Sequence, residues 1–561
     1  MYILGISCFY HDSAACLIKD GAVVAACQEE RFTRIKHDWR FPEESIQYCL
    51  RQAGIGITEI DCIAFYEKPL LKFERVLETF MAVAPRGARA FLDTIPSWLK
   101  QKLWLPHTLE KTLGYKGLLL YFPHHLSHAA SAYFTSPFDE SALLTIDGAG
   151  EWSTASYGYA RGSTLTVTHE MRFPHSLGLL YSAVTAFLGF KVNNDEYKIM
   201  DMEPYGKPEY ADLVLQKLLD LQPDGSLRLD LDYFAFQYGR RMFNAKKFEG
   251  LFGIKARTFE GALTQAHYDI AASIQRVTEI AVVRMAEHVQ RQTGLDALCL
   301  AGGVALNSVA NGRLLREGPF RKLFIQPAAG DAGGAMGAAY AAYHDYFGKT
   351  DRHPIEHAYL GPSYGDQDIR SAIALANVRS ECLPEDALLK TTARLLSEGK
   401  VVGWFQGRME FGPRSLGNRS ILADPRDPGM KDTLNRTVKF RESFRPFAPV
   451  VPIEDASRFF RINAPSPYML FTVPVLTDLI PAVTHVDGSA RVQTMDRSTN
   501  PRFHALLKEF ERLTGIPVLL NTSLNIKGEP IAMTPADAIQ CLTESSMDCL
   551  VLGNCLCYSA P

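Results

Sequence analysis

Two histidines four residues apart are the first side chains with an evident chemical use. His124 and His128 lie in the stretch HHLSH, and on a helix positions i and i+4 share one face. The sequence also offers Asp147 at the end of an apolar run and Asp331 in a glycine-rich turn. Two imidazoles with carboxylates suit Fe(II), Mn(II) or Zn(II) in Lewis-acid chemistry. We therefore predict a metal site, against the plainer interpretation of two surface or core histidines.

A third histidine, His11, lies in the polar break FYHDS between two short apolar runs. A single histidine is usually structural. The break follows a predicted strand at residues 2–8 and is placed where duplicated folds of this kind handle phosphate. A general base that acts on a hydroxyl is therefore the functional interpretation of His11.

Two strands that run into glycine turns predict a nucleotide pocket. The run at 142–147 continues into DGAGE, and ALCLAG continues into GVALN. Such turns direct backbone N–H groups at an anion, although one glycine pair alone can be only a tight turn. The predicted nucleotide-binding residues are Gly148, Gly150, Gly302, Gly303 and Asn307.

The densest cationic stretch lies between residues 406 and 445, where nine lysines and arginines are interleaved with glycines, prolines and aromatic residues. Arginines in such turns suit bidentate recognition of phosphate. Five acids share the window, and the whole chain is near neutral, so a small phosphate compound is favoured over nucleic acid. A polar group, NTSLN, follows the apolar run IPVLL and is placed to bind a small polar ligand.

The elements that must position these residues repeat a pattern. Strand, polar break, strand, turn and strand occur over 2–28 and again over 142–170. This is the plan of an α/β fold of the actin-like (ASKHA) class with two facing phosphate loops. A long helix is expected at 264–293, capped by Thr264 and ended by Gly294. Residues 70–120 predict a helical insertion that covers the site.

Length and composition bound the remaining possibilities. A chain of 561 residues exceeds one core, so two domains are expected, at 1–360 and 375–561. The net charge is −3, which gives no reason to expect a nucleic acid or a membrane surface as partner. No apolar run reaches 18 residues, and the first residues do not resemble a signal peptide. The 11 cysteines form no paired framework and are interpreted as reduced thiols of a cytoplasmic protein.

These motifs together resemble the O-carbamoyltransferases of the NodU/CmcH type. The matching segments run almost from end to end: GISCFYHDSAACLIKDG, EERFTRIKHD, HHLSHAASAY, IDGAGEW, NDEYKIM with PYGKP, AGGVALN, GDAGGAMGAA, GRMEFGPRSLGNRSILADPR, VKFRESFRPFAP and NTSLNIKGEPI. The resemblance implies a Kae1-like first domain followed by a smaller YrdC-like α/β domain.

The resemblance also implies a reaction and roles for residues. The second domain would make carbamoyl-adenylate from carbamoyl phosphate and ATP with Mg²⁺, and the first would pass the carbamoyl group to a hydroxyl of a natural product beside Fe(II) or another divalent metal. His11 would be the base, and Gly302, Gly303 and Asn307 would line the adenylate. The metal ligands would be His124, His128, Asp147 and Asp331. Carbamoyl phosphate and the nucleotide phosphates would be held by Arg414, Lys439, Arg445, Arg491, Asn521 and Ser523.

Some questions stay open at this level. A tRNA threonylcarbamoylation-type enzyme is the alternative, because Kae1-like and YrdC-like parts perform that task too; a non-catalytic scaffold is the third interpretation. The family usually has a sequence such as GLAPYG where this chain has Asp201-Met202-Glu203 before PYG, so the role of that loop is unassigned. The acceptor is not named by any motif, and a homodimer is compatible with the family.

Overall fold

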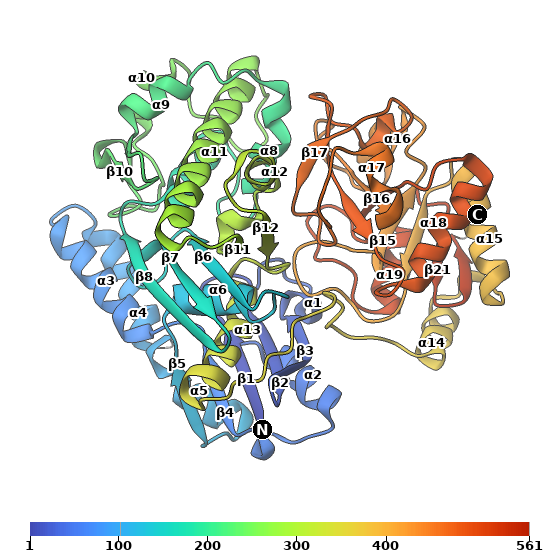
Figure 1. Ribbon diagram of the computed structural model, residues 1–561, viewed down its shortest axis with the longest axis horizontal. Coiled ribbons are helices and arrows are strands. Elements are labelled where there is room, and N and C mark those ends of the chain that lie inside the picture. Colours follow the sequence, from blue (N-terminus) through green and yellow to red (C-terminus); the bar gives the residue numbers. More distant parts are fainter. Residues whose placement is uncertain (101, 560–561) are drawn as a thin grey trace. The chain divides into compact units, whose positions relative to one another are not determined.

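The computed structural model describes residues 1–100 and 102–559, which fold into two compact units (Figure 1). The first unit consists of residues 1–29 and 37–355. The second consists of the short segment Glu30–Lys36 and the chain from Glu356 onward. The chain therefore contributes to the second unit twice, and sequence patterning gave no sign of the early segment.

The first sheet of unit 1 has the strand order β3-β2-β1-β4-β5. Strands β1, β2 and β3 form an antiparallel meander, to which β4 and β5 add in parallel. The tight β2–β3 turn uses Asp20 and Gly21, both with positive φ, as such hairpins require. The strands are β1 (Tyr2–Ser7), β2 (Ala14–Lys19), β3 (Ala22–Gln28), β4 (Cys62–Phe65) and β5 (Leu118–Tyr121).

The second sheet of unit 1 follows the same path, with the order β12-β11-β6-β7-β8. Again three antiparallel strands are followed by two parallel ones. The internal repeat predicted from the sequence pattern is thus present in the topology. The strands are β6 (Glu140–Ile146), β7 (Ser153–Arg161), β8 (Thr164–Arg172), β11 (Ala297–Ala301) and β12 (Lys322–Ile325).

Two helices lie in the layer between these sheets (Figure 1). Helix α13 (Asp331–Ala341) packs on the first sheet, α6 (His124–Tyr133) packs on the second, and the two helices pack on each other. Gly337 makes this close approach possible, because a Cβ at this position would lie only 1.7 Å from the backbone carbonyl oxygen of Ser127 in α6. The predicted ligands on both helices are therefore positioned by one tight helix contact.

We expect Gly337→Ala to destabilise unit 1 by about 3 kcal/mol or more, because the added methyl group must push α13 away from α6. The control is Gly250→Ala in α10 (Ala245–Phe252), where no atom lies within 4 Å of the new methyl group. That change should raise stability by up to about 1 kcal/mol. Thermal unfolding of both variants measures the difference; equal melting temperatures would contradict the packing argument.

Further helices surround the two sheets. Helix α11 (Gln265–Thr293) contacts β6 and β7 and confirms the expected long helix, with Thr264 as its N-cap and Gly294 in the left-handed conformation after its end. Between β4 and β5 the chain forms α3 (Pro69–Ala82), α4 (Ala88–Lys100) and α5 (Leu105–Leu113). The other helices of unit 1 are α2 (Glu43–Ala53), α7 (Leu177–Phe187), α8 (Glu196–Met202), α9 (Ala211–Lys217), α10 and α12 (Ser308–Glu317).

Unit 2 is built on one eight-stranded mixed sheet in the order β13-β22-β21-β14-β15-β20-β16-β19. Trp404 on β14 packs with Phe503 and Phe510 of α18 (Pro501–Thr514) in the main core. Helix α15 (Glu385–Ser397) packs beside α18. The strands are β13 (Arg379–Cys382), β14 (Val402–Phe405), β15 (Arg419–Ala423), β16 (Ala448–Pro452), β19 (Gln493–Met495), β20 (Leu519–Ser523), β21 (Cys549–Leu552) and β22 (Cys555–Tyr558).

One cysteine pair departs from the expectation of reduced thiols. Cys382 and Cys555 form a disulfide. They are 173 residues apart in sequence, and the antiparallel register of β13 and β22 places them directly opposite each other. No local spacing pattern can reveal such a pair. The other nine cysteines are free and buried, as expected.

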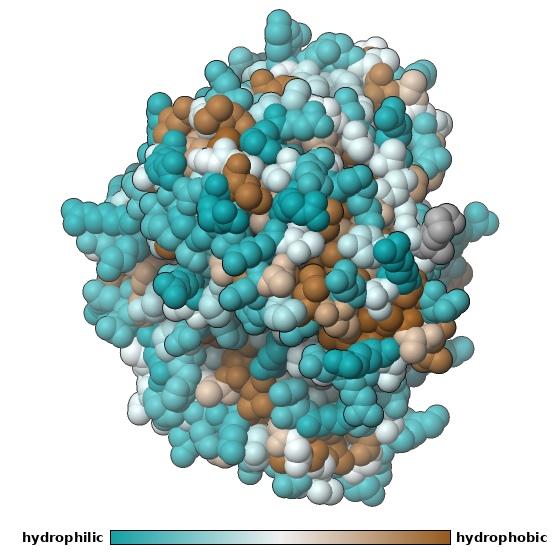
Figure 2. Space-filling view, turned by 90° about the vertical axis from the view of Figure 1, so that its right-hand side faces the viewer, coloured by the Kyte–Doolittle hydropathy of each residue, from teal (hydrophilic) through white to brown (hydrophobic). Residues whose placement is uncertain are grey.

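None of the helices in the described part of the chain combines the length and the apolar character needed to cross a membrane. The surface in Figure 2 is hydrophilic over most of its area, with apolar side chains scattered in small groups.

Candidate metal centre and phosphate-binding site

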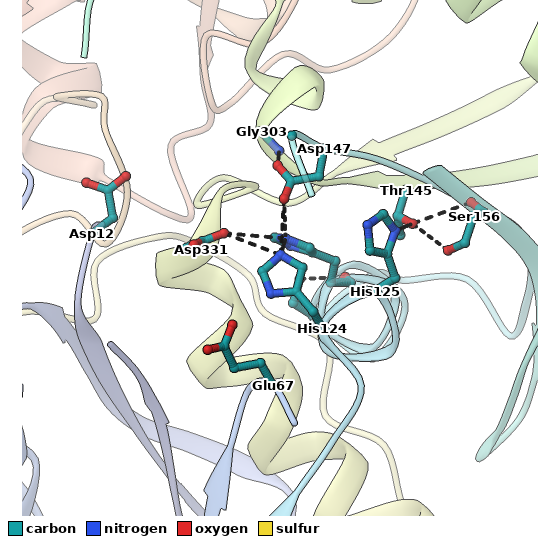
Figure 3. A network of polar contacts seen from close by, with 12 residues as sticks. Asp12, Glu67, His124, His125, Thr145, Asp147, Ser156, Gly303 and Asp331 are labelled. Carbon is teal, nitrogen blue, oxygen red and sulfur yellow. Dashed lines mark hydrogen bonds and ion pairs between the residues drawn. The ribbon is translucent and has the colours of Figure 1, made fainter. Parts of the chain in front are cut away.

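The four predicted metal ligands meet at one point in unit 1. Figure 3 shows three of them, His124, Asp147 and Asp331. Nε2 of His124 lies 3.0 Å from Nε2 of His128 and 3.1 Å from Oδ2 of Asp147. Oδ1 of Asp331 lies 3.6 Å and 3.7 Å from the same two nitrogens. All four donor atoms lie within 4.8 Å of one another, and the two histidines and Asp331 are buried.

The spacing of these atoms fits a divalent transition metal. With metal–ligand bonds of about 2.1 Å, adjacent ligands are separated by about 3.0 to 3.4 Å in octahedral or tetrahedral sites. The two imidazole nitrogens cannot both present lone pairs to each other without a cation or proton between them. The buried Oδ2 of Asp331 has no hydrogen-bond partner among the described residues. The donor set is thus short of positive charge, which an ion would supply.

The electrostatics agree with this deficit. Burial raises the pKa of Asp331 to about 6. The pKa of His124 is lowered well below its ordinary value by burial and by the charge of His128. Burial also lowers the pKa of His128, but hydrogen bonding to Asp147 and the carboxylate charges outweigh it and raise that pKa. The two imidazoles therefore differ in their affinity for a proton, and a divalent ion bound to both would compete with that proton.

Each ligand is fixed by its element. The helical spacing of α6 puts His124 and His128 on one face, whereas His125 turns away and bonds Thr145 at 2.7 Å. The carboxylate of Glu151 accepts the backbone N–H of His124 and so binds at the start of α6. The other oxygen of Asp147 accepts the N–H of Gly303 at 2.9 Å (Figure 3). Asp331 begins α13.

The predicted base His11 lies beside this centre. Its Nε2 is 3.8 Å from Oδ2 of Asp331, and its Nδ1 is 3.0 Å from Asp12. Burial lowers the pKa of His11, but the charge of Asp331 and the hydrogen bond to Asp12 raise it well above its ordinary value. The second oxygen of Asp12 bonds His37 at 2.7 Å. The sequence analysis assigned no role to Asp12 or His37, although Asp12 adjoins His11 in the polar break.

The loop that carries His11 is held in an uncommon backbone conformation. Phe9, Asp12 and His37 all have positive φ. Backbone hydrogen bonds join Phe9 to Trp39 and Ser13 to Asp38, so residues 37–40 brace the loop. Such conformations persist only where the surroundings enforce them, and they gather at functional sites.

The predicted nucleotide-binding residues line the same region. Gly302 has a φ of 94°, and a Cβ there would lie 2.3 Å from the carbonyl oxygen of Ile146. A Cβ at Gly150 would meet His124 at 2.9 Å. Gly148 accepts the hydroxyl of Ser176 through its carbonyl group. Asn307 caps α12 and exchanges two hydrogen bonds with Gln275, so its amide is already engaged within the protein.

In unit 2 three of the predicted phosphate-binding residues, Lys439, Asn521 and Ser523, lie on or against β20. Nζ of the buried Lys439 donates to the backbone carbonyls of Ser523 and Asn525, both at 2.8 Å. Burial and the charges of Arg441 and Arg445 lower the pKa of Lys439 well below its ordinary value. A bound anion would relieve the repulsion among these cations, as the predicted phosphate role requires.

The other predicted residues connect to the same strand. Asn521 on β20 donates to Gln493, two residues after Arg491, and to the carbonyl of Ser415, which follows Arg414. The backbone carbonyl of Arg445 accepts from Asn435 in the segment that leads to Lys439. The charge of Lys36, from the early segment that folds with unit 2, also lowers the pKa of Lys439. The sequence analysis assigned no role to Lys36.

Several cations of the 406–445 stretch have structural roles instead. Arg419 is fully buried, donates to the carbonyl groups of Gln406 and Asn418, and stacks on Phe405 at 3.6 Å. Arg426 pairs in a fork with Asp424. Part of the charge density of the stretch therefore serves loop architecture.

Comparison with known proteins identifies the family. Residues 2–340 match the family described as Carbamoyltransferase N-terminus, and residues 393–558 match Carbamoyltransferase C-terminus. The chain belongs to the carbamoyltransferase family. This carbamoyltransferase is similar over 98% of its length, at 40% identity, to the nodulation protein NolNO of Sinorhizobium fredii, of which it covers 79%.

Two further proteins and one solved structure are similar to the chain to different degrees. Nodulation protein U of Rhizobium tropici is 32% identical over 94% of the carbamoyltransferase chain and 91% of its own. The uncharacterized protein sll1178 of Synechocystis is 51% identical over 99% and 96%. Among solved structures, a ROK hexokinase from Thermus thermophilus aligns with 62% of the chain and all of its own length at 14% identity and a TM-score of 0.28.

Proposed function

We propose that this carbamoyltransferase is ATP-dependent and passes the carbamoyl group of carbamoyl phosphate to a hydroxyl of a small natural product through carbamoyl-adenylate. In this proposal unit 1 is Kae1-like, of the actin-like class, and unit 2 is YrdC-like. The observation that carries it is the pairing of two chemically different sites in one chain: a four-ligand metal centre beside His11, and a buried cationic site around Lys439.

Unit 2 performs the activation step. The cations around Lys439 bind the phosphate groups of carbamoyl phosphate and of ATP, which arrives with Mg²⁺. Water cleaves carbamoyl phosphate to carbamate and inorganic phosphate. A carbamate oxygen then attacks the α-phosphorus of ATP, and pyrophosphate leaves. The products are carbamoyl-adenylate, inorganic phosphate and pyrophosphate.

Unit 1 performs the transfer step. The acceptor oxygen attacks the carbamoyl carbon, and the bond between that carbon and the phosphate oxygen of AMP breaks. His11, which acts in its neutral form, takes the hydroxyl proton at Nε2. Asp12 holds Nδ1 of His11 at 3.0 Å and so orients Nε2 toward the centre. The glycine turns at 148–150 and 302–303 leave room for the adenylate. Fe(II) or another divalent ion, held by His124, His128, Asp147 and Asp331, would supply Lewis-acid stabilisation of the developing oxyanion.

Incubation of the protein with ATP, Mg²⁺ and carbamoyl phosphate, without any acceptor, tests the proposal. We expect pyrophosphate release that requires both substrates, and exchange of labelled pyrophosphate into ATP. Absence of any nucleotide turnover in the presence of Fe(II) would refute it. The tRNA alternative is separated by binding of tRNA at several salt concentrations, because phosphate contacts would give a steep salt dependence.

A further inference from the structure

The helical insertion of unit 1 places a group of cations next to the metal centre. Lys72 and Arg75 on α3 are three residues apart and share a helix face. The buried ammonium group of Lys72 pairs with the buried carboxylate of Glu67 and lies 4.8 Å from the ring centre of Tyr10. The ring of Tyr10 in turn lies 4.6 Å from that of His11. The α3 cations are therefore one aromatic ring away from the predicted base.

These cations exceed the acids available to neutralise them. Glu67 is engaged by Lys72. The guanidinium of Arg75 stacks 4.8 Å from the ring centre of Phe173 and has neither an ion pair nor a side-chain hydrogen bond within residues 1–100 and 102–559. Lys102, just beyond α4, lies 5.0 Å from the ring centre of Trp98 and forms no ion pair in those ranges, although the charge of Glu67 acts on it. The three cations therefore face one ion-paired acid, Glu67, and the charge of Glu151, which acts on Arg75 without an ion pair.

The partly buried position of the two unpaired cations makes their charge costly. Burial lowers the pKa of Arg75, and burial together with the charge of Lys72 lowers the pKa of Lys102 to about 8. Residues kept in such surroundings without a carboxylate partner are suited to bind an anionic ligand. Guanidinium on an aromatic face is a common way to present the fork of N–H donors to a phosphate or carboxylate.

We infer that Arg75 and Lys102 bind an anionic group of the acceptor, so that the substrates of this enzyme are hydroxyl compounds that carry a phosphate or carboxylate. This inference rests on the proposed carbamoyl transfer and names its acceptor class. The anionic group would anchor on the insertion, while the hydroxyl points past Tyr10 toward His11. Lys72 is neutralised by its ion pair with Glu67 and supports the ring of Tyr10 between α3 and His11.

Four hexoses that differ in one substituent test the inference: glucose, glucosamine, glucuronate and glucose 6-phosphate. Carbamoylated product is measured by mass spectrometry, and binding to the metal-loaded full-length protein by calorimetry with carbamoyl phosphate saturating unit 2. We expect an anionic member to exceed glucose at least tenfold in affinity and, where product forms, in kcat/KM. The better of the two anionic members distinguishes phosphate from carboxylate recognition.

Variants assign the preference to the cations. Arg75→Gln combined with Lys102→Gln should reduce the ratio of anionic to neutral hexose by about ten- to a hundredfold, whereas Arg75→Lys should retain part of it. The matched control, Arg89→Gln with Lys100→Gln, removes two exposed cations of the same insertion and should leave the ratio unchanged. Equal binding of glucose and the anionic hexoses, stronger binding of glucosamine, or an unchanged ratio in the first variant would overturn the inference.

The proposed function is judged separately on the same samples. Pyrophosphate release without acceptor reports on unit 2 and does not require the insertion. Absent release with a retained anion preference would refute the adenylate route alone. Normal release with no anion preference would refute the acceptor class alone.

Discussion

Replacement of His124 by alanine is expected to leave acceptor-free pyrophosphate release within about threefold of the wild-type rate, while transfer of the carbamoyl group falls by about a thousandfold. The reason is the division of sites between the two units. Nε2 of His124 lies 3.0 Å from Nε2 of His128 and 3.1 Å from Oδ2 of Asp147, so its loss removes the donor atom that contacts both of these ligands. The measurements are pyrophosphate release, carbamoylated product and metal content per chain.

His125→Ala is the matched control for this experiment. It removes the same buried imidazole from the next position of α6, but His125 bonds Thr145 and takes no part in the four-ligand cluster. Metal content and transfer should therefore survive in His125→Ala and be lost in His124→Ala. Equal loss of both reaction steps in His124→Ala, with the fold intact, would contradict the division of labour.

The cluster of four donor residues could be predicted because its signals are local. An i, i+4 histidine pair requires only a helix, and Asp147 and Asp331 each adjoin glycines at the end of a strand or the start of a helix. The duplicated topology then brings these ends together, since α6 and α13 share one interface. Local periodicity and a repeat were sufficient to anticipate the cluster of four donors that the structure contains.

Other features depend on contacts that no local pattern encodes. Segment Glu30–Lys36 folds with unit 2, where Arg31 donates to the carbonyl of Gly412 and Arg34 to that of Ile531. The Cys382–Cys555 disulfide exists only through strand register. The density of cations in the sequence likewise could not distinguish Arg419, which stabilises loops, from Lys439, which was predicted to bind phosphate. Both side chains are buried and donate to backbone carbonyls, and these contacts depend on the fold.

The complementary result is expected for Lys439→Met, which should lower pyrophosphate release by about a thousandfold while the metal content of unit 1 stays unchanged. Methionine keeps the length of the side chain and removes the donors to Ser523 and Asn525. The matched control is Arg436→Met, which removes an exposed cation from the preceding helical turn and should have no effect. Thermal unfolding of both variants separates lost chemistry from lost stability.

Proton uptake distinguishes a ligand-binding role of Lys439 from a structural one. Its pKa is lowered by burial and by Arg441 and Arg445, so the site without an anion binds fewer protons than an ordinary lysine. A bound phosphate opposes that repulsion and raises the pKa of Lys439, so inorganic phosphate should bind with proton uptake and more tightly as the pH falls. Calorimetry in two buffers of different ionisation enthalpy measures the uptake. A lysine that only ties β20 to its neighbours would show none, and neither should Lys439→Met, whereas uptake that persists in this variant would assign the proton to another group.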